Sequence, residues 1–70
     1  MDINVKQDGS KVYGKILDPE GNALSGVNVV VSGTNYGTVS DHDGTFAIDL
    51  EDNNILTFSY IGYNTVKKTF

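Results

Sequence analysis

The amino-acid sequence predicts an all-β fold, a Greek-key-like β-sandwich of about seven short strands. Apolar residues recur with a period of two along most of the chain, which places them on one face of each half-buried strand. Turn-forming residues interrupt these runs at intervals of roughly 8–12 residues, a spacing typical of all-β sandwiches. No window shows the 3.6-residue period of an amphipathic helix, so we expect no helix.

The strands are expected in order along the chain. Residues 1–10 are polar, and they predict either a flexible segment or an edge strand, with the strand at residues 3–6. The sandwich domain itself is expected over residues 11–70. Four alternating series within it each predict one strand with a buried face. The series are Val12, Gly14 and Ile16; Val27, Val29 and Val31; Phe46, Ile48 and Leu50; and Leu56, Phe58 and Tyr60.

Turn residues separate these series. Residues 18–21, Asp-Pro-Glu-Gly, have proline at the second and glycine at the fourth position of a β-turn, which is the type I pattern. Gly62 lies between Ile61 and Tyr63, where it predicts a bend or a bulge. Further breaks are expected at residues 32–37, 41–44 and 51–54.

Length and composition exclude several classes of protein. The chain has 70 residues, so it forms one domain at most, and it has no cysteine for a disulfide or a Cys-based zinc site. Its net charge of −4 argues against a nucleic-acid partner, which requires a basic surface. No apolar run is long enough to insert into a membrane. The first residues lack the pattern of a signal peptide, so in an exported protein we expect that signal to have been removed.

The residue types that catalysis requires are sparse. The chain has one histidine, no Gly-x-Ser-x-Gly motif and no glycine-rich phosphate loop ending in Gly-Lys. A single imidazole also cannot supply the histidine-rich ligand set of a catalytic zinc. We therefore predict no enzymatic activity, no catalytic residue and no cofactor.

Residues 41–44, Asp-His-Asp-Gly, are the one stretch that resembles a metal-binding loop. A calcium loop of the EF type needs oxygen ligands at alternating positions and a glutamate at the twelfth, but the twelfth residue from Asp41 is Asp52. A hairpin turn explains the same residues, because Asp41 can bond the backbone two residues on and Gly44 accepts positive φ. We predict a turn with a solvated His42 and no metal ion.

Partner contact is the other role that the sequence suggests. Tyr36 lies in a glycine-flanked loop, where an exposed aromatic ring can anchor a partner, unless the ring folds back over the end of the sandwich. Asn35, Tyr36 and His42 are the residues predicted to contact a partner. The apolar Val30, Ile55 and Ile61 fall on outward positions, which indicates either central strands or a docking surface.

A longer pattern runs through most of the chain. From residue 12 it reads V-x-G-x-I-x-D-x-x-G-x-A-L-x-G-V-x-V-x-V-x-G-T, from residue 37 G-T-x-S-D-x-x-G-x-F-x-I, and from residue 56 L-x-F-S-Y-I-G-Y. Over residues 12–66 this pattern resembles the carboxypeptidase-regulatory-like domain, a transthyretin-like (prealbumin-like) β-sandwich. Two positions depart from the family, with Ala23 in place of a frequent proline and Ser40 in place of the usual threonine.

The resemblance implies a function. In Bacteroidetes such domains commonly form the N-terminal extension of SusC-type TonB-dependent transporters of the outer membrane. It implies a periplasmic, non-catalytic domain that acts as a protein-interaction or assembly module in nutrient uptake, with glycans as the nutrient. The implied partner is the rest of the transporter or its complex in the periplasm and outer membrane. The family has no catalytic residues to transfer to this chain.

Two other functions stay open at this point. The chain could be a carbohydrate-binding or adhesive module that holds a glycan through Tyr36 and its loop. It could also be a passive spacer in a secreted or surface protein or a peptidase.

Overall fold

The computed structural model describes residues 1–50 and 55–70, and the described part of the chain consists of strands, turns and loops. No helix in this part is long and apolar enough to cross a bilayer. The strands are β1 Asp2–Asp8, β2 Lys11–Leu17, β3 Asn28–Val31, β4 Gly37–Val39, β5 Thr45–Asp49, β6 Ile55–Ser59 and β7 Val66–Thr69. The predicted break at residues 51–54 lies outside the described residues.

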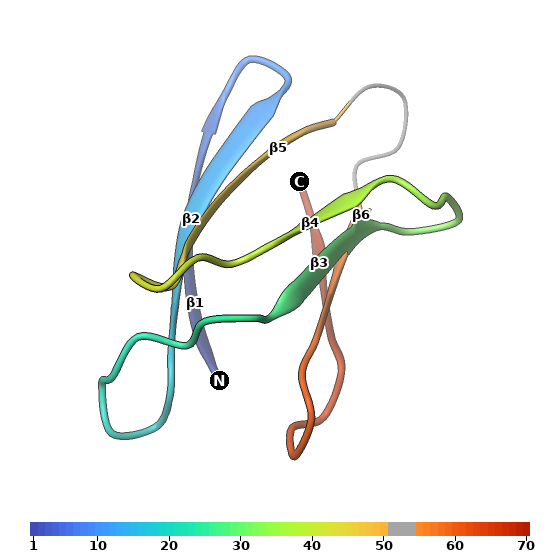
Figure 1. Cartoon of the computed structure of the whole chain (residues 1–70). Helices are drawn as coiled ribbons and strands as arrows, with labels where there is room; N and C mark the ends of the chain where they lie inside the picture. The colour runs from blue at the N-terminus through green and yellow to red at the C-terminus, as the bar shows by residue number, and fades with distance from the viewer. Residues whose placement is uncertain (51–54) are drawn as a thin grey trace.

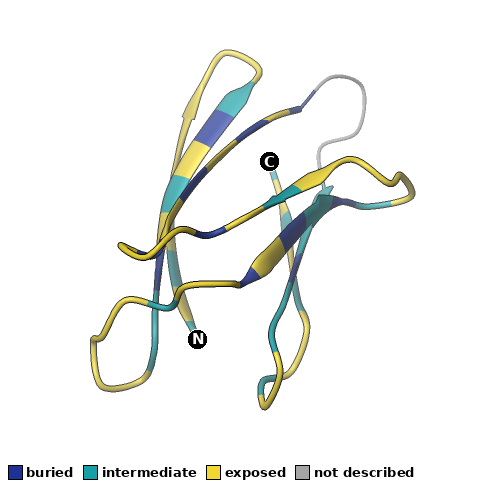
Figure 2. Ribbon diagram, in the orientation of Figure 1, coloured by how far each residue is buried: buried dark blue, intermediate teal, exposed yellow. Residues whose placement is uncertain are grey.

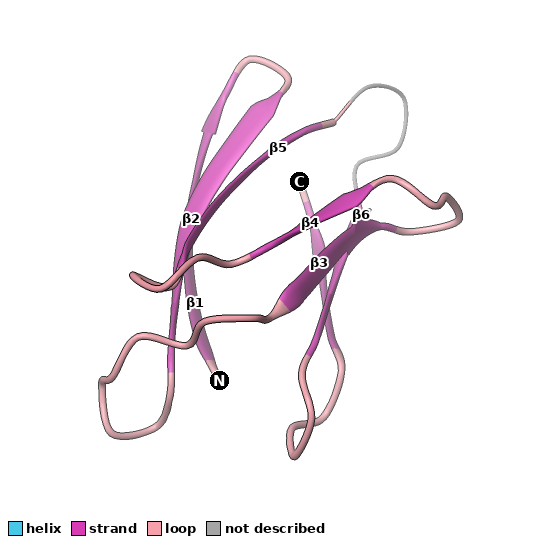
Figure 3. Cartoon of the chain, in the orientation of Figure 1, coloured by secondary structure: helices cyan, strands magenta, loops and turns pink. Residues whose placement is uncertain are grey.

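The strands form two antiparallel sheets that pack face to face (Figure 1, Figure 3). One sheet has the order β1-β2-β5 and the other the order β4-β3-β6-β7. The chain crosses from the first sheet to the second between β2 and β3, and it returns between β4 and β5. The prediction of an all-β sandwich is confirmed.

The strand register places the alternating apolar residues between the sheets. In the three-stranded sheet Val12 lies opposite Ile48, and Ile16 lies opposite Ile3 of the edge strand β1. In the four-stranded sheet Val29 lies opposite Phe58. Because directly paired residues share one face of a sheet, these pairs turn their side chains to the same interior. Figure 2 shows the buried positions alternating with exposed ones along the strands.

The core contains two aromatic rings in contact. Phe46 and Phe58 meet edge to face, with ring centroids 5.5 Å apart and an interplanar angle of 70°. Phe46 also lies opposite Gly14 on β2, and a Cβ atom at Gly14 would overlap the Phe46 ring. The ring thus covers the gap that glycine leaves in the middle of a strand. The buried apolar residues are Val12, Ile16, Val27, Val29, Val31, Phe46, Ile48, Leu50, Leu56 and Phe58.

Some element boundaries differ from the prediction. Val27 is buried but precedes β3, because its N–H bonds a side chain instead of a neighbouring strand. Tyr60 follows β6, where its carbonyl accepts the N–H of Tyr63 at 3.1 Å. Gly62, with φ of 85°, completes this tight turn between β6 and β7. It forms a reverse turn, so of the two predicted alternatives, a bend or a bulge, the bend is the one present.

The outward apolar residues separate into two groups. Val30 and Ile55 are half-buried on β3 and β6, the two inner strands of the four-stranded sheet, where neighbours on both sides cover part of each side chain. Ile61 lies on the turn after β6 and is 89% exposed. The sequence predicted either central strands or a docking surface at these positions, and for Val30 and Ile55 the structure shows central strands.

The two edge strands of the four-stranded sheet, β7 and β4, have different surroundings. On the edge strand β7, Lys68 lies directly opposite Leu56, which is fully buried. Lys68 therefore occupies an inward position of an edge strand and is half-buried. On the other edge β4 approaches β5 of the opposite sheet, and the turn at residues 41–44 connects the two strands.

Replacing Phe58 by alanine should destabilise the domain by about 3–5 kcal/mol, because Phe58 is fully buried and contacts Phe46. Urea denaturation followed by circular dichroism measures this loss. Val39→Ala, at a residue that is 53% exposed, is the matched control and should cost less than about 1 kcal/mol. Phe58→Leu should give an intermediate value, and equal stability of Phe58→Ala and Val39→Ala would contradict this account of the core.

Candidate functional site

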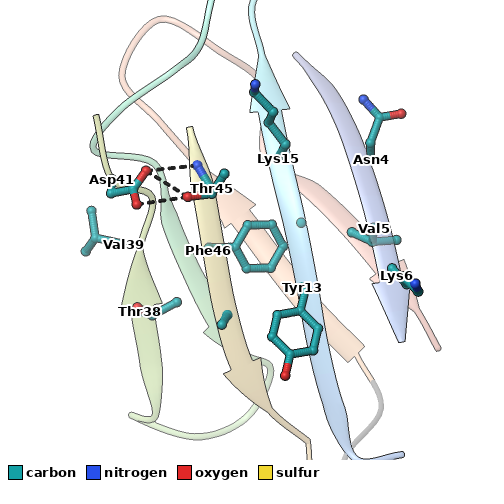
Figure 4. A pocket seen from close by; sticks show the side chains of 12 residues that line it. Asn4, Val5, Lys6, Tyr13, Lys15, Thr38, Val39, Asp41, Thr45 and Phe46 are labelled. Atoms are coloured by element: carbon teal, nitrogen blue, oxygen red, sulfur yellow. Dashed lines mark hydrogen bonds between the residues drawn. The ribbon is translucent and has the colours of Figure 1, made fainter. Parts of the chain in front are cut away.

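Residues 41–44 form the tight turn that connects β4 to β5. The N–H of Gly44 donates to the Asp41 carbonyl at 2.9 Å, and the N–H of Asp41 donates to the Thr45 carbonyl at 2.9 Å. The Asp41 carboxylate accepts the N–H of Asp43 at 2.9 Å and that of Thr45 at 3.1 Å. It also accepts the Thr45 hydroxyl at 2.9 and 2.8 Å, as Figure 4 shows. The carboxylate thus organises the turn, as predicted.

Gly44 allows this turn to lie against the neighbouring strand. Its φ is 77°, and a Cβ atom there would lie 2.6 Å from the carbonyl oxygen of Ile16. The close approach lets the N–H of Ile16 donate to the Gly44 carbonyl at 2.8 Å. Glycine is required here for two reasons, the backbone conformation and the lack of space.

The Asp41 carboxylate in this turn is engaged by the protein itself. The side-chain and backbone hydrogen bonds from Thr45 hold the pKa of Asp41 below its ordinary value, because they stabilise the ionised form. Each of Asp41, His42 and Asp43 offers one atom that could bind a metal ion. These three atoms lie within 4.8 Å of one another, and all three residues are exposed. Both Asp41 oxygens already accept hydrogen bonds, which is the arrangement of a turn. The absence of a bound metal ion stays a prediction.

The three predicted contact residues do not form one site. Tyr36 is 51% exposed in the loop before β4, where its N–H donates to the Thr34 hydroxyl at 3.0 Å. Asn35 precedes it and is exposed. His42 is exposed in the turn after β4, and its Nε2 lies 3.5 Å from Asp43 Oδ1. The strand β4 separates Tyr36 and Asn35 from His42, and the two loops lie at opposite ends of it (Figure 1).

Ser40 has a role that sequence reasoning missed. It is buried, and it is the one buried polar residue in the described part of the chain. Its hydroxyl donates to the Leu24 carbonyl at 2.7 Å and accepts the N–H of Val27 at 2.9 Å. Its backbone also bonds Gly26 and Val27. The family resembled by this sequence usually has threonine at this position, and serine and threonine share the hydroxyl group that makes these bonds. That shared hydroxyl could have indicated the role of Ser40.

A shallow groove lies on the outer face of the three-stranded sheet, with a volume of about 720 Å³ (Figure 4). Residues of β1, β2 and β5 line it, most of them on the outward face, and β4 closes it on one side. Tyr13 and Val39 contribute exposed apolar surface, at 44% and 53% exposure. Alternation places Tyr13 and Lys15 on one face of β2, but the strands that lie beside them could not be read from the sequence. The lining residues are Asn4, Val5, Lys6, Tyr13, Gly14, Lys15, Thr38, Val39, Asp41, Thr45, Phe46 and Ala47.

Ser40→Ala should destabilise the domain by about 1–3 kcal/mol, because the Val27 N–H and the Leu24 carbonyl both lose their partner. Chemical denaturation provides the measurement. Ser25→Ala removes the same hydroxyl from an exposed position and should leave stability unchanged within about 0.5 kcal/mol. Ser40→Thr keeps the hydroxyl and should lose less than Ser40→Ala. The proposed role of Ser40 would be wrong if Ser40→Ala were as stable as Ser25→Ala.

Asp41→Asn should reduce stability at neutral pH and flatten its dependence on acid. The folded pKa of Asp41 is lowered, so the ionised carboxylate stabilises the fold above the unfolded pKa, and this contribution is lost as the pH falls through the folded pKa. The difference in unfolding free energy between the two proteins should therefore shrink below about pH 4. Urea titrations between neutral and acidic pH measure it. Asp43→Asn is the control, since it removes a carboxylate from the same turn and keeps the bonds of Asp41; an equal effect there would overturn the assignment.

Comparison with known proteins gives a consistent result. The model of the CarboxypepD_reg-like domain family matches residues 12–70. TonB-dependent receptor P39 of Formosa agariphila is 44% identical over 64 residues, which cover 90% of this chain and 6% of that receptor. TonB-dependent receptor SusC of Bacteroides thetaiotaomicron is 42% identical over 52 residues, which cover 74% of this chain and 5% of that receptor.

These relatives are far longer than the chain, which spans only 6% of the length of P39. The comparison with solved structures found none that matches. The family model, the two antiparallel sheets and the glycine-dependent turn after β4 agree with one another. The chain belongs to the carboxypeptidase-regulatory-like (CarboxypepD_reg-like) domain family.

Proposed function

We propose that the chain is a non-catalytic domain of a SusC-type TonB-dependent transporter and acts there as a protein-interaction or assembly module. The observation that carries this proposal is the match to TonB-dependent receptors over 90% and 74% of the chain, although the chain spans only 6% and 5% of their length. A small sandwich that forms so little of a receptor contributes to its work by contact with other parts or partners. The nutrient proposed for uptake is a glycan.

The location proposed for the domain is the periplasmic side of the outer membrane. A receptor that depends on TonB works at the outer membrane, and a compact domain with a net charge of −4 fits an aqueous compartment beside it. Its partner is proposed to be the rest of the transporter or a protein of its complex. Exposed Tyr36, Asn35 and His42 are proposed partner contacts at the two ends of β4.

The chemistry of the described residues supports a role without catalysis. A nucleophile needs a base within hydrogen-bond reach, and the chain has one histidine, which lies exposed beside Asp43. The buried hydroxyl of Ser40 bonds backbone groups of residues 24 and 27 and lies in the connection between the sheets. The first group lies in a turn and the second stabilises the connection between the sheets, and these structural roles support the proposal of a domain that acts by protein contact.

Deletion within the full receptor tests the proposal. Replacing residues 1–70 by a flexible linker should leave the receptor in the outer membrane but reduce growth on its glycan at least several-fold. Outer-membrane proteomics measures the amount of receptor, and growth on glycan and on glucose measures uptake. The full receptor with Ser25→Ala, at an exposed residue outside the groove, is the control for manipulation of the gene. Normal growth of the deletion strain on the glycan, with the complex intact, would instead indicate a passive spacer.

A further inference from the structure

We infer that the groove on the outer face of the three-stranded sheet binds an extended peptide that carries acidic residues next to an apolar one. This inference rests on the proposed role in protein interaction and names the surface and the partner chemistry. The groove does not contain Tyr36 or His42, so it is separate from the contacts that the sequence predicts.

The hollow of the groove comes from small residues between larger ones. Ala47 on β5 lies directly opposite Tyr13 on β2, and Gly14 lies opposite Phe46, whose ring is turned to the core. Ala47 therefore leaves a low area beside the Tyr13 ring, and Val39 of β4 bounds it on the other side. An apolar side chain of a partner fits between Tyr13 and Val39, since both expose apolar surface there.

Two lysines give one side of the groove a positive charge. Lys6 of β1 lies opposite Tyr13, and Lys15 follows Tyr13 by two residues on the same face of β2. Among the described residues neither lysine has an ion pair, whereas Lys11 on this face pairs with Asp49 at 3.9 Å. Asp41 lies on the β4 side of the groove, with its carboxylate bonded to Thr45, which is directly opposite Lys15 (Figure 4).

This local charge contrasts with the whole chain. The net charge is −4, yet the groove is lined by two lysines, Lys6 and Lys15, and one carboxylate, that of Asp41. The other charged residues of this outer face, Lys11, Asp2, Asp8 and Asp49, do not line the groove. Carboxylates of a partner could form ion pairs with Lys6 and Lys15, which have none among the described residues. Such complementary charges favour an acidic partner and speed its encounter.

The polar groups of the groove favour a peptide over an oligosaccharide. A sugar presents many hydroxyl groups, and its site needs several side-chain donors and acceptors. Asn4 supplies an amide and Thr38 a hydroxyl, but the Thr45 hydroxyl and the Asp41 carboxylate already bond each other. Most of the remaining lining is apolar, from Val5, Tyr13, Val39 and Ala47. An acidic peptide with an apolar anchor matches this combination.

NMR titration of the isolated domain tests the inference, since the domain is compact with its own core. The probe is the acetylated, amidated peptide Glu-Glu-Val-Leu-Val, and the same peptide with lysines in place of its two glutamates is the control. The acidic peptide should shift the backbone amide signals of Tyr13, Lys15, Val39 and Ala47. The double variant Lys6→Glu with Lys15→Glu should weaken binding by about tenfold or more. Lys67→Glu, the same charge change on β7, should leave it unchanged.

Several outcomes would overturn the inference. The first is no shift of groove signals at millimolar peptide, and the second is equal binding of the basic peptide. The third is a titration in which a uronic acid trisaccharide shifts the groove signals and the acidic peptide does not shift them. Thermal melting of each variant excludes loss of folding as the cause. In the full receptor, normal growth of the double lysine variant beside a growth defect of the domain deletion would reject the groove and keep the proposed function.

Discussion

A series of hydrogen bonds at one corner of the sandwich fixes the position of one sheet relative to the other. The Ile16 N–H donates to Gly44, and the Ile16 carbonyl accepts the Leu24 N–H. The Leu24 carbonyl in turn accepts the hydroxyl of Ser40. Two crossings between the sheets, before β3 and after β4, meet at these residues. With no disulfide and a core of small size, the domain depends on this corner to fix how its sheets face each other.

The corner also explains which parts of the fold could be predicted. Alternation located the strands because Val12, Ile48 and Phe58 each serve a buried face, and this requirement is local. The bonds of Ser40 join residues that are 13 and 16 positions apart, and no local pattern reports such a pairing. The prediction for Gly62 left a bend and a bulge open for a related reason. A glycine with positive φ suits a bulge and a reverse turn equally, and the pairing of β6 with β7 decides between them.

The candidate site was predicted less completely than the fold. The turn at Asp41 follows from its own side chain, so residues 41–44 sufficed to anticipate it. Tyr36 and His42 were expected to contact a partner, but the sequence could not reveal that β4 holds them apart. The groove required the order β1-β2-β5, which brings Lys6 beside Tyr13 and Tyr13 beside Ala47. A surface formed by neighbouring strands depends on topology, and a single sequence carries little information about that.

Lys68 has a consequence for the behaviour of the domain among its copies. It occupies an inward position on β7, so a strand from another molecule that extended the sheet there would have to cover its ammonium group. Burial of an unpaired charge is unfavourable, and natural proteins protect open sheet edges with such residues. The lysine therefore makes this edge a poor template for polymerisation. A domain built from short strands can then be present at high local density and stay monomeric at that edge.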